Sequence, residues 1–249
     1  MRAPSGRPLR TLAIAVSLGA AVVAWAPAPA AAADPSPAPS APALAPAPAP
    51  AFAAGDPLPA CTTADDPAPF RRYGEWASTL VDTRFALPRA YAPPDLVSTS
   101  NAGTNGGYLV RRLVIADLRA MVRAAAAAGV RIRVDSGYRS YARQAAVYAY
   151  YVDLLGPVKG ALRAARPGHS EHQLGTAMDI RNTAGAYTWL ARHGWKYGFV
   201  ISFPKGMTSI SCYQYEPWHI RYYGRTRAIG MHWAAAVPRA WLWAHVVAV

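Results

Sequence analysis

Acidic residues, cysteines and long apolar runs are all scarce in this chain of 249 residues. Thirteen Asp and Glu residues stand against 26 Lys and Arg, only three of the acids are glutamate, and there are two cysteines. Two cysteines allow at most one disulfide. The formal charge is +13, and the basic residues do not form a run in the sequence. The positive charge is therefore either dispersed over the surface or gathered on a basic face that binds polyanions. In an exported protein those polyanions would be wall polymers or anionic lipid, and no nucleic acid is expected.

The N-terminus is typical of a secretory signal. Three arginines within the first ten residues precede an uncharged apolar stretch from Thr11 to Trp25, and small residues at 31–33 offer a cleavage site before Asp34. The alternative is an uncleaved membrane anchor, through which the protein would contact the membrane. Pro27 and Pro29 end the apolar stretch well short of the roughly 20 residues that a spanning helix needs. We therefore expect residues 1–33 to be a signal peptide and the protein to be secreted.

Residues 34–59 are almost entirely Ala, Pro and Ser. Prolines recur every second or third residue, so neither helix nor sheet can propagate, and there is little apolar surface to bury. This composition predicts a disordered, partly polyproline linker. Residues 60–249 then have the length of one domain with a sizeable core, and no repeat or second linker interrupts them.

Cys61 and Cys212 are the only cysteines in the chain. In an oxidising compartment they can form one disulfide, which would tie the entry of the domain to the segment before Glu216. Closing so long a loop would stabilise the fold by roughly 4–5 kcal/mol in the chain-entropy model. Two unpaired thiols are the alternative.

Two histidines and two acids stand in the pattern His172-x6-Asp179 and Glu216-x-x-His219. Two imidazoles and one carboxylate suit zinc, and three protein ligands leave a fourth tetrahedral position for water. Glu216 lies where a general base for that water is expected. The pattern therefore predicts a catalytic Zn²⁺ site with His172, Asp179 and His219 as ligands and Glu216 as base. His193, His232 and His245 have no comparable spacing.

Three segments that surround these residues resemble the VanY-type D-alanyl-D-alanine carboxypeptidases, zinc metallopeptidases of the bacterial cell wall. They are SGYRSYARQ (Ser136–Gln144), HSEHQLGTAMDI (His169–Ile180) and YEPWHIRYYG (Tyr215–Gly224). They occur in the order found in the family, and the resemblance runs from about Tyr73 to the C-terminus. Three motifs in order are far more specific than a single Glu-x-x-His.

The resemblance implies roles for further residues. Arg139, in the first segment, corresponds to the family arginine that stabilises the oxyanion of the tetrahedral intermediate. Ser170 matches the serine that helps to hold the terminal carboxylate of the substrate. Tyr138 and Trp218 are expected to form walls of the pocket, and His169 to shape it.

The pattern of apolar residues predicts an α+β fold, with a small antiparallel sheet that carries the zinc site and helices packed on one side. Helices are expected at 109–128, from a cap at Ser140 to 154, at 186–193, at 226–235 and after Pro238. Strands are expected at 130–135, 176–180, 199–203 and 210–215. The C-terminal tryptophans Trp233, Trp241 and Trp243 are expected to pack in the core, with membrane or glycan contact as the alternative.

Together these features predict a secreted zinc D,D-carboxypeptidase that removes the terminal D-alanine from peptidoglycan stem peptides or their precursor. One alternative is a peptidoglycan endopeptidase that cuts an L-alanyl-D-glutamate bond or a D,D cross-link. Another is a wall-binding module without catalysis, although the presence of Glu216, Arg139 and all three ligands argues against it. No feature indicates an oligomeric state.

Overall fold

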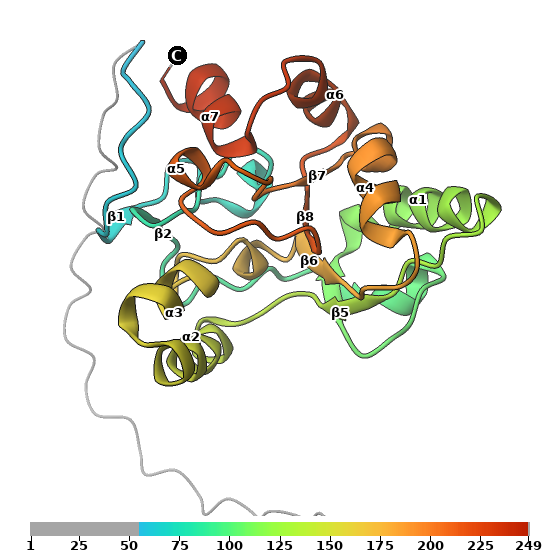
Figure 1. The fold of residues 1–249 in the computed structure, drawn as a ribbon, viewed down its shortest axis with the longest axis horizontal. Helices are drawn as coiled ribbons and strands as arrows, with labels where there is room; N and C mark the ends of the chain where they lie inside the picture. The colour runs from blue at the N-terminus through green and yellow to red at the C-terminus, as the bar shows by residue number, and fades with distance from the viewer. Residues whose placement is uncertain (1–54, 249) are drawn as a thin grey trace, which may run out of the picture. The chain divides into compact units, whose positions relative to one another are not determined.

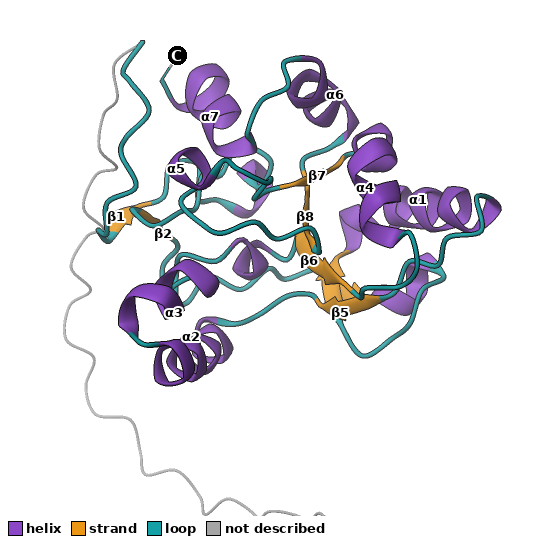
Figure 2. Cartoon of the chain, viewed as in Figure 1, coloured by secondary structure: helices purple, strands orange, loops and turns teal. Residues whose placement is uncertain are grey.

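The computed structural model describes residues 55–248, which form short strands and mostly short helices (Figure 2). The strands are β1 (Asp66–Pro67), β2 (Phe85–Ala86), β3 (Leu96–Ser98), β4 (Leu109–Arg111), β5 (Val134–Ser136), β6 (Ala177–Ile180), β7 (Phe199–Ile201) and β8 (His219–Tyr222). The α-helices are α1 (Ile115–Ala127), α2 (Tyr141–Leu155), α3 (Pro157–Arg163), α4 (Ala186–His193), α5 (Thr208–Ser211), α6 (Arg225–Trp233) and α7 (Pro238–Leu242).

Four strands form the sheet at the centre of the described residues. Their order is β5-β6-β8-β7, and every neighbouring pair is antiparallel. In the β6–β8 pair Asp179 lies opposite His219, and Ala177 lies opposite Arg221. Because side chains alternate across a strand, these four residues point to one face of the sheet.

The other face of the sheet is apolar and packs on helices. Met178, Ile180 and Ile220 are buried there against side chains of α1 and α4. Figure 1 shows α1 and α4 on one side of the sheet, away from α2 and α3. The predicted α+β class with a small antiparallel sheet is confirmed, and α2 and α3 add helices on the side of the polar face.

A second core joins the start and the end of the described chain. Phe85, Tyr223 and Trp243 are buried in it together with Leu174, which directly follows the HSEHQ motif. The buried Arg239 donates to the Asp82 carboxylate at 2.6 Å, which fixes the C-terminal helices to the early segment. The first described residues run beside α7 (Figure 1), and the Gly55 amide donates to the Ala248 carbonyl at 2.9 Å.

A disulfide joins Cys61 to Cys212, with the two Cα atoms 5.2 Å apart. Cys212 ends the short helix α5 with a positive φ of 69°. The bond therefore attaches the entry of the domain to the loop that continues to Glu216, as the position of the two cysteines predicts.

Several predicted elements match the structure closely. Ser140 caps α2 by accepting a hydrogen bond from the Arg143 amide, and α4 has the predicted bounds. The predicted helix at 109–128 begins late, because residues 109–111 pair with β3 as strand β4. The predicted strand at 210–215 is wrong, since α5 and a loop occupy it, and the strand β8 that carries His219 was not predicted.

The C-terminal tryptophans do not share one environment. Trp243 is buried in the second core, and Trp241 packs against it. Trp233, however, is 75% exposed, so the prediction that it packs in the core is wrong. Trp233 is the last residue of α6, and its ring meets that of Trp195 edge to face with the ring centroids 6.0 Å apart.

The predicted signal peptide and residues 34–54 of the predicted linker lie outside the described residues. Residues 55–59, the end of that linker, contact the C-terminal segment: the Trp243 indole donates to the Asp56 carbonyl, and Arg239 donates to the Pro59 carbonyl. Within residues 55–248 we find no helix with the length and apolar character required to cross a membrane.

Removal of the disulfide should destabilise the fold. The bond closes a sequence separation of 151 residues, and removal of a native disulfide typically costs about 2–5 kcal/mol. We expect the Cys61→Ser, Cys212→Ser double variant to lose about this much free energy of unfolding in urea. Wild-type protein with dithiothreitol is the matched control. An unchanged unfolding midpoint in both samples would show that the bond does not stabilise the domain.

Candidate metal centre

The register of β6 and β8 brings Asp179 and His219 together. They are cross-strand partners, and Asp179 Oδ1 lies 3.1 Å from His219 Nδ1. His219 is 3% exposed, and its Nε2 lies 3.0 Å from a carboxylate oxygen of Glu171. Burial alone would lower the pKa of His219, but the hydrogen bonds to Asp179 and Glu171 raise it to about 9. Because a metal ligand must be neutral imidazole, a bound cation would replace the proton on Nδ1.

His172 lies in a short 3-10 turn, η4 (Glu171–Leu174), and its side chain approaches Asp179 and His219. Ser170 caps this turn by accepting a hydrogen bond from the His172 amide at 3.4 Å. The His172 ring donates from Nδ1 to the Gly137 carbonyl at 2.7 Å, and its Nε2 lies 3.3 Å from Asp179 Oδ2. Burial, with the nearby Arg139, lowers the pKa of His172 to about 4, so the ring is neutral.

These three side chains fit a metal ion. One ligand atom from each of His172, Asp179 and His219 lies within 4.8 Å of the other two. Among the described residues the buried Nε2 of His172 has no hydrogen-bond partner, and an orphaned imidazole nitrogen of this kind is suited to coordinate a cation. Two imidazoles and a carboxylate match the donor set of catalytic zinc sites.

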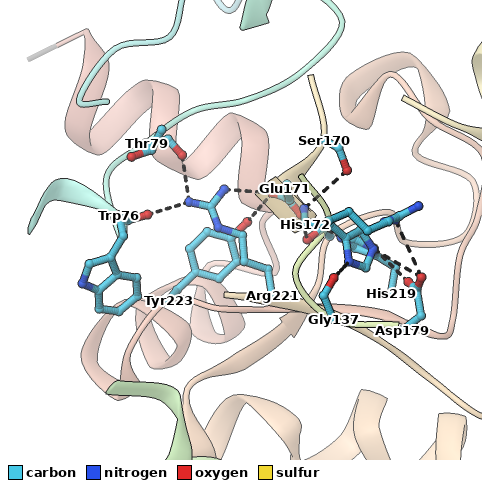
Figure 3. A network of polar contacts seen from close by, with 12 residues as sticks. Trp76, Thr79, Gly137, Ser170, Glu171, His172, Asp179, His219, Arg221 and Tyr223 are labelled. Atoms are coloured by element: carbon cyan, nitrogen blue, oxygen red, sulfur yellow. Dashed lines mark hydrogen bonds and ion pairs between the residues drawn. The ribbon is translucent and has the colours of Figure 1, made fainter. Parts of the chain in front are cut away.

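A buried acidic residue, Glu171, orients His219 from behind (Figure 3). Its carboxylate accepts hydrogen bonds from Ser202 Oγ at 2.6 Å, from Arg221 at 2.9 Å and from the Tyr223 hydroxyl at 3.1 Å. Burial alone would raise the pKa of Glu171, but Arg221 and the hydrogen-bonded His219 hold it well below its usual range. Glu171 is therefore a carboxylate that fixes the orientation of the His219 ring.

Arg221 links this carboxylate to the early part of the chain. It has no exposed surface, and its Nη2 donates to the carbonyls of Trp76 and Thr79 at 2.9 and 2.8 Å. Figure 3 shows the chain of contacts from these two carbonyls through Arg221 and Glu171 to the histidines. Each buried charge in the chain thus has a partner of opposite sign or a carbonyl dipole.

Glu216 lies in the loop before β8 and is 8% exposed. Its amide donates to the Phe203 carbonyl at 3.1 Å, and its carbonyl accepts from the His219 amide at 3.1 Å, so the backbone holds it beside the metal ligands. Burial raises the pKa of its carboxyl to about 7, although His219, Arg163 and Arg139 oppose the rise. A carboxyl that titrates near neutral pH is suited to accept and return a proton.

Arg139 follows β5 and lies next to Asp179. Its Nη2 is 3.8 Å from Asp179 Oδ2, and its amide donates to the His172 carbonyl at 3.2 Å. Burial lowers the pKa of Arg139, while Asp179 and Glu216 act against that shift. The loop needs a glycine at Gly137, because a Cβ there would lie 2.3 Å from the Leu109 carbonyl oxygen. This close passage lies beside two contacts with His172, whose ring donates to the Gly137 carbonyl and whose own carbonyl accepts from the Arg139 amide.

Most of these side chains line one cavity of about 140 Å³. Its lining contains Glu216, Arg139 and the three candidate ligands, and also Ser170 and Trp218 as predicted. His169 is part of the wall as well. Tyr138, predicted as a wall residue, is not among the lining residues.

Two of the polar residues in this site were not identified from the sequence. Glu171 stands directly before His172 in the SEHQ motif, and its burial is the feature that separates it from a surface acid. Arg163, which contacts Glu216, belongs to no recognised motif. The position of Glu171 beside a ligand was the one available signal, and nothing in the sequence marked Arg163.

Comparison with known proteins identifies the family. A family model described as VanY, D-alanyl-D-alanine carboxypeptidase, matches residues 108–225. The putative carboxypeptidase YodJ of Bacillus subtilis is 37% identical over 165 residues, which cover 60% of this chain and 60% of that protein. This chain therefore spans about three fifths of the length of that curated relative.

Two solved structures share the fold. The LdcB LD-carboxypeptidase, described in connection with peptidoglycan recognition, is 33% identical with a TM-score of 0.59 over 65% of this chain and 83% of that one. A variant of the vancomycin resistance D,D-pentapeptidase VanY, solved in complex with Zn(II), is 28% identical with a TM-score of 0.61 over 67% and 99%. The chain belongs to the VanY-type D-alanyl-D-alanine carboxypeptidase family.

Replacement of Glu171 by Gln should weaken metal binding. The substitution removes the charge that orients His219, and loss of such a partner typically lowers metal affinity about 10–100-fold. Competition with a chromophoric zinc chelator measures the change, and thermal unfolding of both proteins verifies the fold. The matched control is Asp135→Asn, which breaks the exposed ion pair with Arg181. Equal zinc affinity in Glu171→Gln and wild type would contradict this role.

Proposed function

We propose that the chain is a zinc-dependent D,D-carboxypeptidase that removes the terminal D-alanine from peptidoglycan stem peptides. The observation that carries the proposal is the meeting of His172, Asp179 and His219 with Glu216 and Arg139 in one cavity. The membership of the chain in the VanY-type family and its likeness to a D,D-pentapeptidase with bound Zn(II) support the metal and the substrate class.

The chemistry is hydrolysis of the last peptide bond. His172, Asp179 and His219 would hold the zinc ion, which would supply a lowered pKa for a water molecule and polarisation of the scissile carbonyl. Glu216 accepts a proton from the water molecule as the water oxygen attacks the carbonyl carbon. Glu216 then gives this proton to the leaving nitrogen as the C–N bond breaks. The products are a shortened peptide with a new carboxylate and free D-alanine.

Arg139 and Ser170 would stabilise the charges of the substrate. Arg139 lies 3.8 Å from the ligand Asp179, so its guanidinium is placed to stabilise negative charge on the carbonyl oxygen during attack. Ser170, 5% exposed in the cavity wall, offers a hydroxyl for the terminal carboxylate. Trp218 supplies an apolar wall against the D-alanine side.

A second candidate is an L,D-carboxypeptidase, which removes D-alanine from a residue of L configuration. The likeness to LdcB, at 33% identity over 83% of that chain, favours it. The catalytic groups are the same in both reactions. The difference is the configuration of the residue on the acyl side of the bond, so pentapeptide and tetrapeptide substrates distinguish the two.

The decisive assay uses the purified protein with zinc and a synthetic stem pentapeptide that ends in D-alanyl-D-alanine. We expect mass spectrometry to show loss of one alanine, and no loss in the presence of a chelator. Glu216→Gln should reduce kcat by at least about 100-fold, since it removes general base catalysis. Zinc content shows that this variant still binds metal.

Other products identify other functions. Cleavage only of the tetrapeptide would establish the L,D-carboxypeptidase, and cleavage at an internal bond would establish an endopeptidase. Retention on purified peptidoglycan without any cleavage, in protein with bound zinc, would establish a wall-binding module.

The proposal includes export to the cell wall. The signal-like residues 1–33 support it, and the disulfide between Cys61 and Cys212 is of a kind that persists in oxidising compartments. We expect the intact mass of protein recovered from the culture medium to correspond to a chain that begins at Asp34. Full-length protein with reduced cysteines, retained inside the cells, would contradict export.

A further inference from the structure

Arg163 contacts the catalytic base directly. Its Nη1 donates to Glu216 Oε1 at 2.8 Å, in an ion pair whose carboxylate side chain is 11% exposed. Arg163 is the last residue of α3 and lines the same cavity as the candidate metal ligands. No predicted role and no motif of the sequence accounts for it.

Two aromatic rings hold the guanidinium of Arg163 in place. Its Cζ lies 4.8 Å from the ring centroid of Trp218 and 4.9 Å from that of Tyr151, distances typical of cation–π contacts. Trp218 is adjacent to the ligand His219, and Tyr151 belongs to α2. The arginine is thus fixed by three groups around the cavity and differs from a flexible surface cation.

The packing of α3 against α2 is shaped for this contact. At Gly160 a Cβ would lie 2.7 Å from the Tyr151 carbonyl oxygen, so only glycine permits the two helices to approach so closely. One turn later the chain reaches Arg163. The close approach of α3 to α2 therefore places the Arg163 guanidinium beside the ring of Tyr151 and beside Glu216.

The contact restricts how Glu216 can act. A planar guanidinium bound to Oε1 limits rotation of the carboxylate and leaves Oε2 to accept the proton of the attacking water. Proton transfer depends on this geometry, and a displacement of about 1 Å can reduce a rate about 100-fold.

We propose that Arg163 is the positioning residue of the base: the ion pair and the two aromatic contacts hold Glu216 in the orientation required for proton transfer. The inference rests on the proposed hydrolytic function and deepens it. Arg163 acts through Glu216, in contrast to Arg139, which lies beside the ligand Asp179.

The kinetic test compares Arg163→Met with Lys159→Met in the full-length protein. Lys159 is an exposed residue of the same helix α3 and is the matched control. We expect Arg163→Met to lower kcat about 10–100-fold with KM changed less than about threefold, because the effect is on the chemical step. Arg163→Lys, which retains the charge, should recover part of kcat. A rise in KM with unchanged kcat would overturn the proposal and assign Arg163 to substrate binding.

A second measurement does not depend on turnover. The chain has three glutamates, so protein with ¹³C-labelled glutamate carboxyls gives few NMR signals, and Glu216→Gln identifies the one from Glu216. Arg163→Met should move this signal and leave the other two in place. In the Glu216→Gln background, Arg163→Met should cause no further loss of rate, since both changes act on one group.

The outcomes separate the two proposals. An additive loss of rate in the double variant, or an unmoved Glu216 signal, would overturn the role of Arg163 while wild-type cleavage upholds the enzyme. A moved signal together with no cleavage by the wild type would overturn the proposed function, and with it the positioning of a base.

Discussion

The pairing of Asp179 with His219 across β6 and β8 is the constraint on which the site depends. The register places both side chains on the polar face of the sheet, while Met178 and Ile220 enter the apolar core beneath. Because side chains alternate along a strand, a slip of one residue would exchange the two sets. The packing of the core therefore also fixes the positions of the candidate metal ligands.

A chain of buried charged side chains leads away from this pair. His219 contacts Glu171, Glu171 contacts Arg221, and Arg221 ends on backbone carbonyls. A buried carboxylate without partners would be neutral, but four donors keep Glu171 ionised at the position where it orients the imidazole. On the other side of the cavity Glu216 is buried with fewer compensating groups, so its pKa is raised to about 7. Two glutamates 45 positions apart in one fold thus have pKa values shifted in opposite directions by the groups around them.

The parts of the site that could be predicted are those marked by residues close together in the sequence. The ligands and Glu216 stand at short, characteristic spacings, and the α2 cap at Ser140 is a local signal. Glu171 and Arg163 were missed because their roles come from partners about 50 residues away, which no spacing reveals. A tertiary contact also explains why the helix expected at 109–128 begins late. Residues 109–111 pair with β3 as strand β4, and this pairing outweighs the helical periodicity of these residues.

The carbonyls of Trp76 and Thr79 that receive Arg221 lie outside residues 108–225, the part of the chain that carries the family signature. The recognisable region is consequently not a self-contained module: a copy transferred alone into another protein would contain every candidate ligand, yet Nη2 of Arg221 would lose both of its carbonyl acceptors. Recombination that preserves the buried partners of Arg221 therefore has to carry residues 76–107 along with residues 108–225, which makes this segment part of the same heritable unit.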